Sequence, residues 1–267
     1  MCLHFFTFLR ELFRYRKMIV DLAFRDFQKR YLGSYFGIVW AFANPFATIL
    51  VFWFVFDFGF KAKPVQDVPY ILWLISGIIP WFYFLDSWSI ANMAIVDSSY
   101  LVSKVVFRVS ILPLVKIIST LIVHFFLLFL TIIFLVCYGY YPAWTYLQIF
   151  YYLFSMIVLL LGLSWLTSAL TVFIRDLGHI LSIALQLLFW VTPILWPVNI
   201  LPNKYKLLLD ANPLCYIVQG YRDSFISHQW FWEKPAEGAY FWIVTFLIFF
   251  VGAISFSRLR PHFADVL

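Results

Sequence analysis

Charged residues are scarce in this sequence, in which Asp, Glu, Lys and Arg make up 12% of 267 residues. About a quarter of a typical soluble domain is charged and about half is apolar, whereas 64% of this chain is hydrophobic. A soluble fold of this size could not bury so much apolar surface, and a disordered chain needs low hydrophobicity with high charge. The composition therefore excludes a water-soluble enzyme and an intrinsically disordered protein.

Motifs for catalysis and nucleotide binding are also lacking. No glycine is followed by lysine, so the chain has no GxxxxGK[ST] phosphate loop and cannot bind ATP by that route. It has no GxSxG motif, no DxD motif for a sugar nucleotide, and no clustered carboxylate pair such as a glycosidase uses. We therefore expect a protein that is not an enzyme and has no cofactor of its own. A partner subunit would have to bind any ATP and magnesium.

Cysteine is rare, and its spacing argues against a metal site. Cys2, Cys137 and Cys215 lie far apart and form neither a CxxC pair nor a Cys/His cluster. We expect no bound metal and three buried, unreactive thiols. A disulfide between Cys137 and Cys215 is a weaker alternative.

Long apolar runs dominate the sequence instead. A transmembrane helix needs about 20 mainly apolar residues, and the runs here are too long and continuous for the short alternating strands of a membrane barrel. Six runs qualify, at about 36–60, 70–95, 110–138, 146–173, 178–198 and 239–257. We expect an all-α polytopic membrane protein with six transmembrane helices. Residues 1–34 would form a cytoplasmic amphipathic interface helix, and residues 35–267 a single transmembrane domain.

The distribution of Lys and Arg predicts the orientation, since cytoplasmic loops carry the excess of positive charge. With the N-terminus inside, twelve basic residues fall on the inner side: Arg10, Arg14, Arg16, Lys17, Arg25, Lys29, Arg30, Lys104, Arg108, Arg175, Arg258 and Arg260. Six fall on the outer side: Lys61, Lys63, Lys204, Lys206, Arg222 and Lys234. Both termini are therefore expected in the cytoplasm. The net charge of +6 suits anionic membrane lipid and gives no reason to expect nucleic acid.

The first 30 residues have no signal-peptide core and read as an amphipathic helix lying in the membrane surface. Its apolar stripe is predicted at Phe5, Leu9, Leu12, Phe13, Val20, Phe24 and Phe27. Its basic face would point toward lipid headgroups. The helix could serve only as an anchor, or as a docking surface for a cytoplasmic partner.

Residues 198–238 form a loop that is too apolar to lie entirely in water. Two short helices, at about 203–211 and 213–226, are expected to dip into the membrane from the outer side. Asn212-Pro213 is a favourable helix start, because Asn caps and Pro is tolerated at the first position. A helical cap without a gating role is the alternative.

Polar residues inside the spans are costly and usually have partners. Asp86 and Lys116 lie at depths about 6 Å apart at 1.5 Å per residue, so we expect them to form an intramembrane pair. Lys116, Thr120 and His124 share one helix face, where His124 is expected to be a hydrogen-bonded packing residue.

Two mixed polar and aromatic stripes are candidates for the lining of a substrate channel, with helix packing as the alternative. The first is Trp40, Asn44 and Thr48; the second is Ser182, Gln186, Phe189 and Trp196. In the fourth span, Gly162, Ser164, Thr167, Ser168 and Thr171 are small enough for close helix contact.

An ordered set of short motifs resembles the type-2 export permeases of ABC transporters. More narrowly, it is similar to the permeases that export lipid-linked surface polymers, namely O-antigen, capsule and wall teichoic acid. The motifs cover about residues 25–226 in order: 30–40 (RYLGSYFGIVW), 44–45 (NP), 77–82 (GIIPWF), 101–107 (LVSKVVF), 111–114 (ILPL), 173–177 (FIRDL), 192–194 (TPI), 212–214 (NPL) and 220–222 (GYR). Arg108 departs from the pattern, since many members have proline there.

The resemblance implies a half-transporter in the bacterial plasma membrane. Two copies would form a homodimer, and two copies of a cytoplasmic ABC ATPase would power it. ATPase coupling would involve Ser98, Lys104, Phe107, Arg175, Asp176 and His179, and the outer gate would include Asn212, Pro213, Tyr216 and Arg222. The substrate would be a glycan or teichoic acid polymer on undecaprenyl diphosphate.

Two other functions remain open from the sequence. The same architecture could export a small drug, haem or a lipid. A membrane enzyme acting on lipid-linked sugar would need catalytic groups at an interface, for which Asp210, Arg222 and Asp223 are the candidates. The identity of the polymer and the type of cell envelope cannot be read from the residues.

Overall fold

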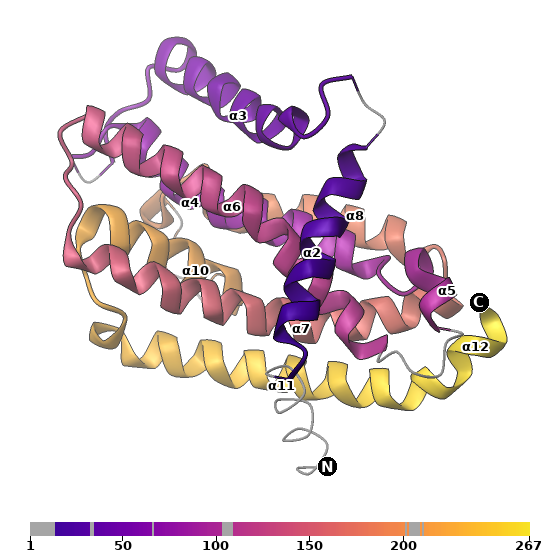
Figure 1. The fold of residues 1–267 in the computed structure, drawn as a ribbon. Coiled ribbons are helices and arrows are strands. Elements are labelled where there is room, and N and C mark those ends of the chain that lie inside the picture. Colours follow the sequence, from indigo (N-terminus) through magenta and orange to yellow (C-terminus); the bar gives the residue numbers. More distant parts are fainter. Residues whose placement is uncertain are drawn as a thin grey trace.

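Helices make up nearly all of the regular structure in this computed structural model, which describes residues 14–32, 35–65, 67–102, 109–200, 202, 209 and 211–267 (Figure 1). In those ranges the only β pairing is an isolated bridge between Val65 and Val68. The longer helices are α2 (Arg16–Tyr31), α3 (Val39–Trp53), α4 (Tyr70–Asn92), α6 (Leu112–Cys137), α7 (Ile149–Phe173), α8 (Leu177–Val191), α10 (Pro213–Arg222) and α11 (Pro235–Leu259). The short ones are η1 (Phe54–Gly59), η2 (Val96–Ser98), α5 (Ser99–Val102), η3 (Val109–Ile111), η4 (Trp144–Gln148), η5 (Val198–Ile200), η7 (Asp223–Ser227), η8 (Phe231–Glu233), η9 (Arg260–His262) and α12 (Phe263–Val266).

Five of the six predicted spans are helices long and apolar enough to cross a membrane. Four of them include an adjoining short helix. The five ranges are Val39–Gly59, Tyr70–Asn92, Val109–Cys137, Trp144–Phe173 and Pro235–His262. They lie roughly side by side in one bundle (Figure 1). The multi-pass membrane architecture is therefore confirmed.

The sixth predicted span is shorter than expected. The run at 178–198 forms α8, which has 15 residues and ends at Val191, with Thr192 in extended conformation. At 1.5 Å per residue α8 is about 22 Å long, less than the roughly 30 Å hydrocarbon core. Pro193 and Pro197 explain the early end, because proline cannot continue a helix and disfavours the α conformation of the residue before it.

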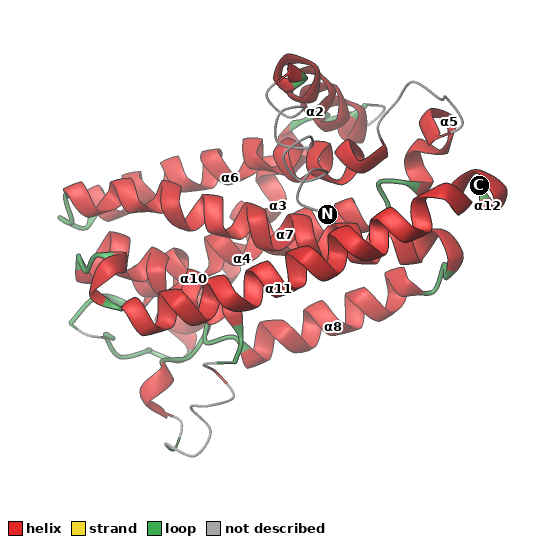
Figure 2. Cartoon of the chain, turned by 90° about the horizontal axis from the view of Figure 1, so that it is seen from below, coloured by secondary structure: helices red, strands yellow, loops and turns green. Residues whose placement is uncertain are grey.

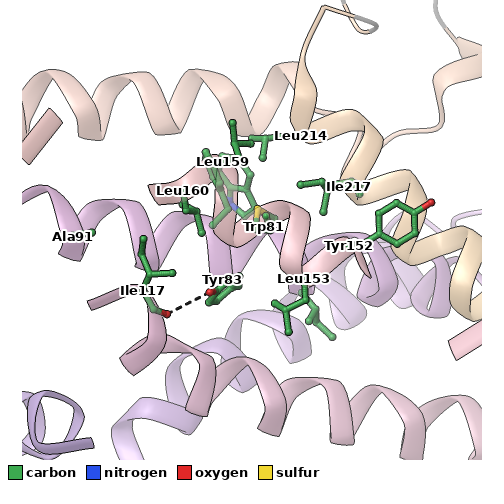
Figure 3. Packing of buried hydrophobic residues seen from close by; sticks show 14 of the residues in the cluster. Trp81, Tyr83, Ala91, Ile117, Tyr152, Leu153, Leu159, Leu160, Leu214 and Ile217 are labelled. Atoms are coloured by element: carbon green, nitrogen blue, oxygen red, sulfur yellow. Dashed lines mark hydrogen bonds between the residues drawn. The ribbon is translucent and has the colours of Figure 1, made fainter. Parts of the chain in front are cut away.

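The core is built around α4, which packs against α6, α7 and α10. Every residue from Tyr70 to Trp81 is buried, as expected for a helix that is apolar on all sides. Figure 3 shows Trp81 and Tyr83 among leucine and isoleucine side chains of neighbouring helices, with the Tyr83 hydroxyl donating to the Ile117 carbonyl. This buried helix fixes the positions of the elements around it.

Helices α7 and α11 approach very closely because glycines face each other. A Cβ added to Gly252 would lie 2.1 Å from the Gly162 carbonyl oxygen, and one added to Gly162 would lie 2.7 Å from Phe249 Cα. Ser164, Thr167, Ser168 and Thr171 on α7 are also buried. The prediction that small residues in this span permit close helix contact is confirmed.

Helix α2 runs across the long helices and packs against α6 (Figure 1). Its buried residues are Ile19, Ala23 and Phe27, whereas Val20 and Phe24 are exposed. The predicted apolar stripe was therefore wrong in part: Phe27 belongs to the buried face, but that face is rotated toward Ile19. Phe5, Leu9, Leu12 and Phe13 lie outside the described residues.

Helices α3 and α8 lie at edges of the bundle, α3 in Figure 1 and α8 in Figure 2. Only Leu181 and Leu185 are buried on α8, and only Ala41 and Ile49 on α3. The exposed apolar residues of α8 are Ile180, Ile183, Leu187, Trp190 and Val191. Each of these two helices therefore has a mainly exposed apolar face.

The second helix predicted in the loop at 198–238 is present as α10 and η7. Asn212 caps it, since the Leu214 backbone N–H donates to Asn212 Oδ1 at 3.0 Å, and Pro213 occupies the first turn. The first predicted helix, at about 203–211, lies outside the described residues except for positions 209 and 211. Helix α10 lies at the opposite end of the bundle from α5 and α12 (Figure 2).

The cysteines differ from expectation. Neither Cys137 nor Cys215 forms a disulfide, and Cys137 at the end of α6 is exposed rather than buried. Cys2 lies outside the described residues.

Candidate functional site

A groove of about 370 Å³ lies where α3, α4 and α8 meet. It collects four of the seven residues that the sequence assigns to the channel: Thr48, Ser182, Gln186 and Phe189. These residues come from two spans far apart in the sequence. The structure therefore brings one residue of the first predicted stripe and three residues of the second together at one site.

The other three predicted channel residues do not line this groove. Trp40 is 45% exposed near the start of α3 and packs edge-on against Phe36, and Asn44 is exposed one turn before Thr48. The Thr48 hydroxyl donates to the Asn44 carbonyl at 3.0 Å. Trp196 lies beyond the end of α8 and donates from its indole N–H to the Trp190 carbonyl at 3.2 Å.

Helix α4 contributes a wall of the groove that the sequence reasoning missed. Trp81, Leu85 and Ser89 line it at i, i+4 spacing, and the Trp81 ring lies 5.4 Å from that of Phe189. The i, i+4 spacing of these three residues is present in the sequence and is the signal that could have identified this wall.

Polar side chains on this side of the bundle are exposed although they lie in membrane-spanning helices. Asn44, Ser89, Ser182 and Gln186 are all exposed. Ser182 satisfies its hydroxyl by donating to the Gly178 carbonyl at 2.9 Å. An amide facing hydrocarbon without a partner is costly, so such groups usually face a cavity, water or another protein surface. These exposed polar groups are therefore expected to face a cavity, water or another protein surface, and not hydrocarbon.

A cluster of charged groups fixes α2 to the start of α6. Lys116 Nζ lies 2.6 Å from Asp26 Oδ1, and Arg30 Nη2 lies 2.6 Å from Asp26 Oδ2. The Ser119 hydroxyl donates to Asp26 at 2.9 Å and accepts from Arg30. Asp97, in η2, lies 3.8 Å from Lys116.

This cluster corrects the predicted pair of Asp86 and Lys116. Lys116 pairs with Asp26 because α6 turns that side chain toward α2, and comparing depth alone did not reveal this rotation. Asp86 is exposed on α4, within electrostatic reach of Arg30. The charges of α2 therefore face the bundle in part, and not only the lipid headgroups.

Burial and partners act in opposite directions on Asp26. Burial alone raises the pKa of its carboxyl, whereas the hydrogen bond from Lys116 and the charge of Arg30 lower it. The partners prevail, and the pKa of Asp26 is held below its ordinary value. The carboxylate is therefore charged at neutral pH and serves as the centre of the cluster.

The predicted coupling residues that are described gather at the end of the bundle that holds α5. Arg175, Asp176 and His179 are exposed at the turn between α7 and α8, and Ser98 is half-buried in η2. The end of α4 lies beside this turn, since a Cβ on Gly178 would lie 2.9 Å from Met93 Cε. Lys104 and Phe107 lie outside the described residues.

At the other end of the bundle, Arg222 joins three elements. It is 2% exposed, and its guanidinium donates to the carbonyls of Trp73 at 3.4 Å, Pro193 at 2.7 Å and Ile194 at 2.9 Å. The same group lies 3.5 Å from the centre of the Trp73 ring. Arg222 thereby satisfies carbonyls left without helical partners where the chain breaks after α8.

The remaining predicted gate residues surround this contact. The Asn212 amide donates to the Thr192 hydroxyl at 3.0 Å, next to the break after α8. Tyr216 is buried, with its hydroxyl 3.1 Å from that of Tyr151. Asn212, Pro213, Tyr216 and Arg222 all line one cavity. The four residues assigned to the gate are therefore neighbours in space.

His124 is a packing residue in the core. Its Nε2 lies 3.0 Å from the Tyr221 hydroxyl, and the ring is 1% exposed. Within the described residues, no group of three or more His, Cys, Asp and Glu side chains is close enough to hold a metal ion.

Comparison with known proteins gives consistent similarities. A family model described as "ABC-2 type transporter" matches residues 19–226. The chain is 29% identical to an O-antigen export system permease protein RfbA of Klebsiella pneumoniae, over 94% of this chain and 95% of that protein. It is 28% identical to RfbA of Myxococcus xanthus, over 96% and 98% of the two chains. It is 23% identical to the polysialic acid transport protein KpsM of Escherichia coli, over 80% and 84%.

Proposed function

The chain belongs to the ABC-2 type transporter family, and from that premise we propose that it is the membrane-spanning permease subunit of a polysaccharide exporter. It is a multi-pass protein of the inner membrane with at least five apolar helices long enough to span it. The relatives named for O-antigen export match nearly its whole length, and the relative named for polysialic acid transport is more distant. These similarities favour an O-antigen-like polymer as the substrate. We propose undecaprenyl diphosphate as its lipid carrier.

The observation that carries the proposal is the groove of α3, α4 and α8. Its exposed hydroxyl and amide groups, on Ser89, Ser182 and Gln186, suit the hydroxyls of a sugar chain. Trp81 and Phe189 supply aromatic surface beside them. Such contacts are individually weak and tolerate different sugars, which suits a polymer that moves continuously through the site.

A homodimer would complete the conduit. The apolar faces of α3 and α8 are left uncovered on either side of the groove, with Val51 58% and Leu187 63% exposed. A second copy packed against these faces would cover them and would enclose the polar groups between two matching walls. This arrangement has the closed two-fold symmetry that is most common among homo-oligomers.

A separate ATPase would supply the energy, because the chain has no phosphate loop. We assign its docking surface to the end of the bundle with Ser98, Arg175, Asp176 and His179. Most described basic residues also lie in elements at or near that end, including α2, the turn before α8 and the end of α11. Both termini would then lie in the cytoplasm, in agreement with the excess of positive charge there.

Removing the chain from its host tests the export function. We expect surface polysaccharide to disappear and the lipid-linked polymer to accumulate inside the membrane. Unchanged surface polymer in the deletion strain would contradict the proposal.

A pull-down of the tagged full-length chain in mild detergent tests the partner. We expect an ATPase in equal amount, and a homo-oligomer alone would overturn the half-transporter assignment.

A further inference from the structure

A second and larger cavity, of about 790 Å³, lies at the α10 end of the bundle and is separate from the groove of α3, α4 and α8. Its walls come from α10, the start of α11, Trp73 of α4 and the chain just after α8. Ligand pockets in proteins are typically about 300–1,000 Å³, so this cavity is large enough for a small ligand or part of a polymer.

The described residues of its wall include two cations, Arg222 and Lys234, and both already have partners. The Arg222 guanidinium donates to three backbone carbonyls and lies over the Trp73 ring. Lys234 forms an ion pair with Asp223. Neither cation is therefore available to neutralise an incoming phosphate.

The polar groups in the wall that can still form a hydrogen bond with a ligand are hydrogen-bond acceptors. Glu237 lines the cavity and forms no hydrogen bond or ion pair with any described residue. Gln219 donates from its amide nitrogen to Asp223 at 3.0 Å, and its side-chain oxygen has no partner in the described part of the chain. A carboxylate and an amide oxygen attract hydroxyl groups and repel phosphate.

Aromatic surface accompanies these acceptors. Tyr240 lines the cavity and is 41% exposed, and its hydroxyl donates to the Ala211 carbonyl at 3.2 Å, which fixes the orientation of the ring. The negative face of an aromatic ring attracts the slightly positive C–H groups on the face of a sugar.

We propose that this cavity binds one or two uncharged pyranose units of the polymer as it leaves the groove. The inference rests on the proposed export function and adds an exit-side sugar site to it. The Glu237 carboxylate, which has no ion-pair partner among the described residues, disfavours diphosphate and polyol-phosphate groups as occupants.

The chain contains its own reporter for occupancy. The Cys215 thiol lines the cavity, whereas Cys137 lies outside its wall at the same end of the bundle. We would label both thiols with a small membrane-impermeant maleimide in the native host, using a Cys2→Ser chain. The two states compared are cells making the polymer and cells in which the first sugar-transfer step of its synthesis is blocked.

The expected result is that active polymer synthesis protects Cys215 several-fold and leaves Cys137 unchanged. Equal labelling of Cys215 in the two states would overturn the proposal. Protection of both thiols would mean general shielding by surface polymer, which also contradicts a specific site. The deletion strain described above reports on export itself, so failure of the site and failure of the proposed function give different results.

Variants of the cavity provide a second measurement. Glu237→Gln should reduce the rate at which newly made polymer reaches the surface by roughly five-fold, the effect typical of weakening one hydrogen bond. Asp57→Asn, an exposed carboxylate in η1 outside the cavity, is the matched control. Tyr240→Ala is compared in the same way with Tyr141→Ala. Equal rates in the cavity variants and their controls would contradict the proposal.

Discussion

At the residue scale, the least expected feature is a buried arginine that forms no ion pair with any carboxylate in the described part of the chain. Arg222 is held by backbone carbonyls and an aromatic ring, and Gly77 leaves room for it: a Cβ there would lie 2.5 Å from the Arg222 guanidinium. The sequence pointed to Arg222 through a family motif, but its acceptors lie up to 149 residues away along the chain. No local pattern could have identified them.

Substitution of Gly77 by alanine should displace the guanidinium. Overpacking of this kind typically costs about 1–3 kcal/mol. We therefore expect Gly77→Ala to lower the free energy of unfolding of the detergent-solubilised protein by that amount. Gly59→Ala is the control, because nothing lies within 4 Å of a Cβ at that position. Equal stability of the two variants would mean that Arg222 is not tightly held.

The Asp26 carboxylate predicts a dependence of stability on pH. Because its pKa is lowered in the folded protein, its stabilising contribution is fully present above its ordinary pKa of about 4 and is lost as pH falls through the lowered value. We expect Asp26→Asn to cost about 1–2 kcal/mol at pH 7, less than a fully buried pair, since the site is partly exposed.

The cost of Asp26→Asn should shrink below pH 4, as measured by unfolding of the purified protein at pH 7 and at pH 3. Asp21→Asn, an exposed carboxylate on the same helix, is the control. A cost that is the same at both pH values would show that Asp26 does not act through its charge.

At the scale of elements, the sequence predicted the long helices well because each depends on local hydrophobicity. The sequence also predicted where a helix begins or ends when asparagine or proline determines that end directly, as at Asn212 and Pro193. Rotation of a helix about its axis was harder to predict. The buried face of α2 and the partner of Lys116 are both set by packing against α6, which hydrophobicity along one segment does not reveal.

The close approach of α7 and α11 can be tested with a single substitution. A Cβ at position 252 would overlap the Gly162 carbonyl oxygen, and backbone cannot move aside as a flexible side chain can. We expect Gly252→Ala to separate the two helices, to destabilise the protein by about 2–3 kcal/mol and to lower the amount of folded protein in the membrane. Stability equal to that of Gly59→Ala would show that the helices can part without cost.

At the scale of the whole molecule, the proposed transport cycle needs the two ends of the bundle to be connected. The end with η2 and the turn before α8 would receive the ATPase, and the end with α10 would release polymer. Helix α8 runs between them, starting beside Asp176 and ending at the break that Arg222 holds. A movement of the ATPase would therefore reach the exit through α8.

Charge reversal at the start of α8 tests this connection. We expect Arg175→Glu or Asp176→Lys to abolish most surface polymer while the protein remains in the membrane at normal level, since both side chains are exposed and contribute little to folding. ATP hydrolysis by the purified complex should no longer respond to the permease. Lys63→Glu, an exposed cation between α3 and α4, is the control. Normal export from the Arg175 and Asp176 variants would remove this coupling assignment.

The sequence singled out residues of α3 and α8 that the structure places around one groove, because polar residues within apolar runs are easily recognised. It could not show that α4 supplies the third wall, which depends on how three spans meet. It also could not reveal the exit-side cavity, whose walls are joined by Arg222 and by the turn into α11.

The most direct test of the account is to locate the moving polymer. A photo-crosslinking amino acid would replace Gln186 in the groove, or Ile243 on the exposed face of α11 as the control, in cells that are exporting polymer. We predict a covalent adduct between chain and polysaccharide at position 186 that disappears when polymer synthesis is blocked, and none at position 243. An adduct at 243 alone, or at neither position while export continues, would contradict the assignment of the groove as the path of the polymer.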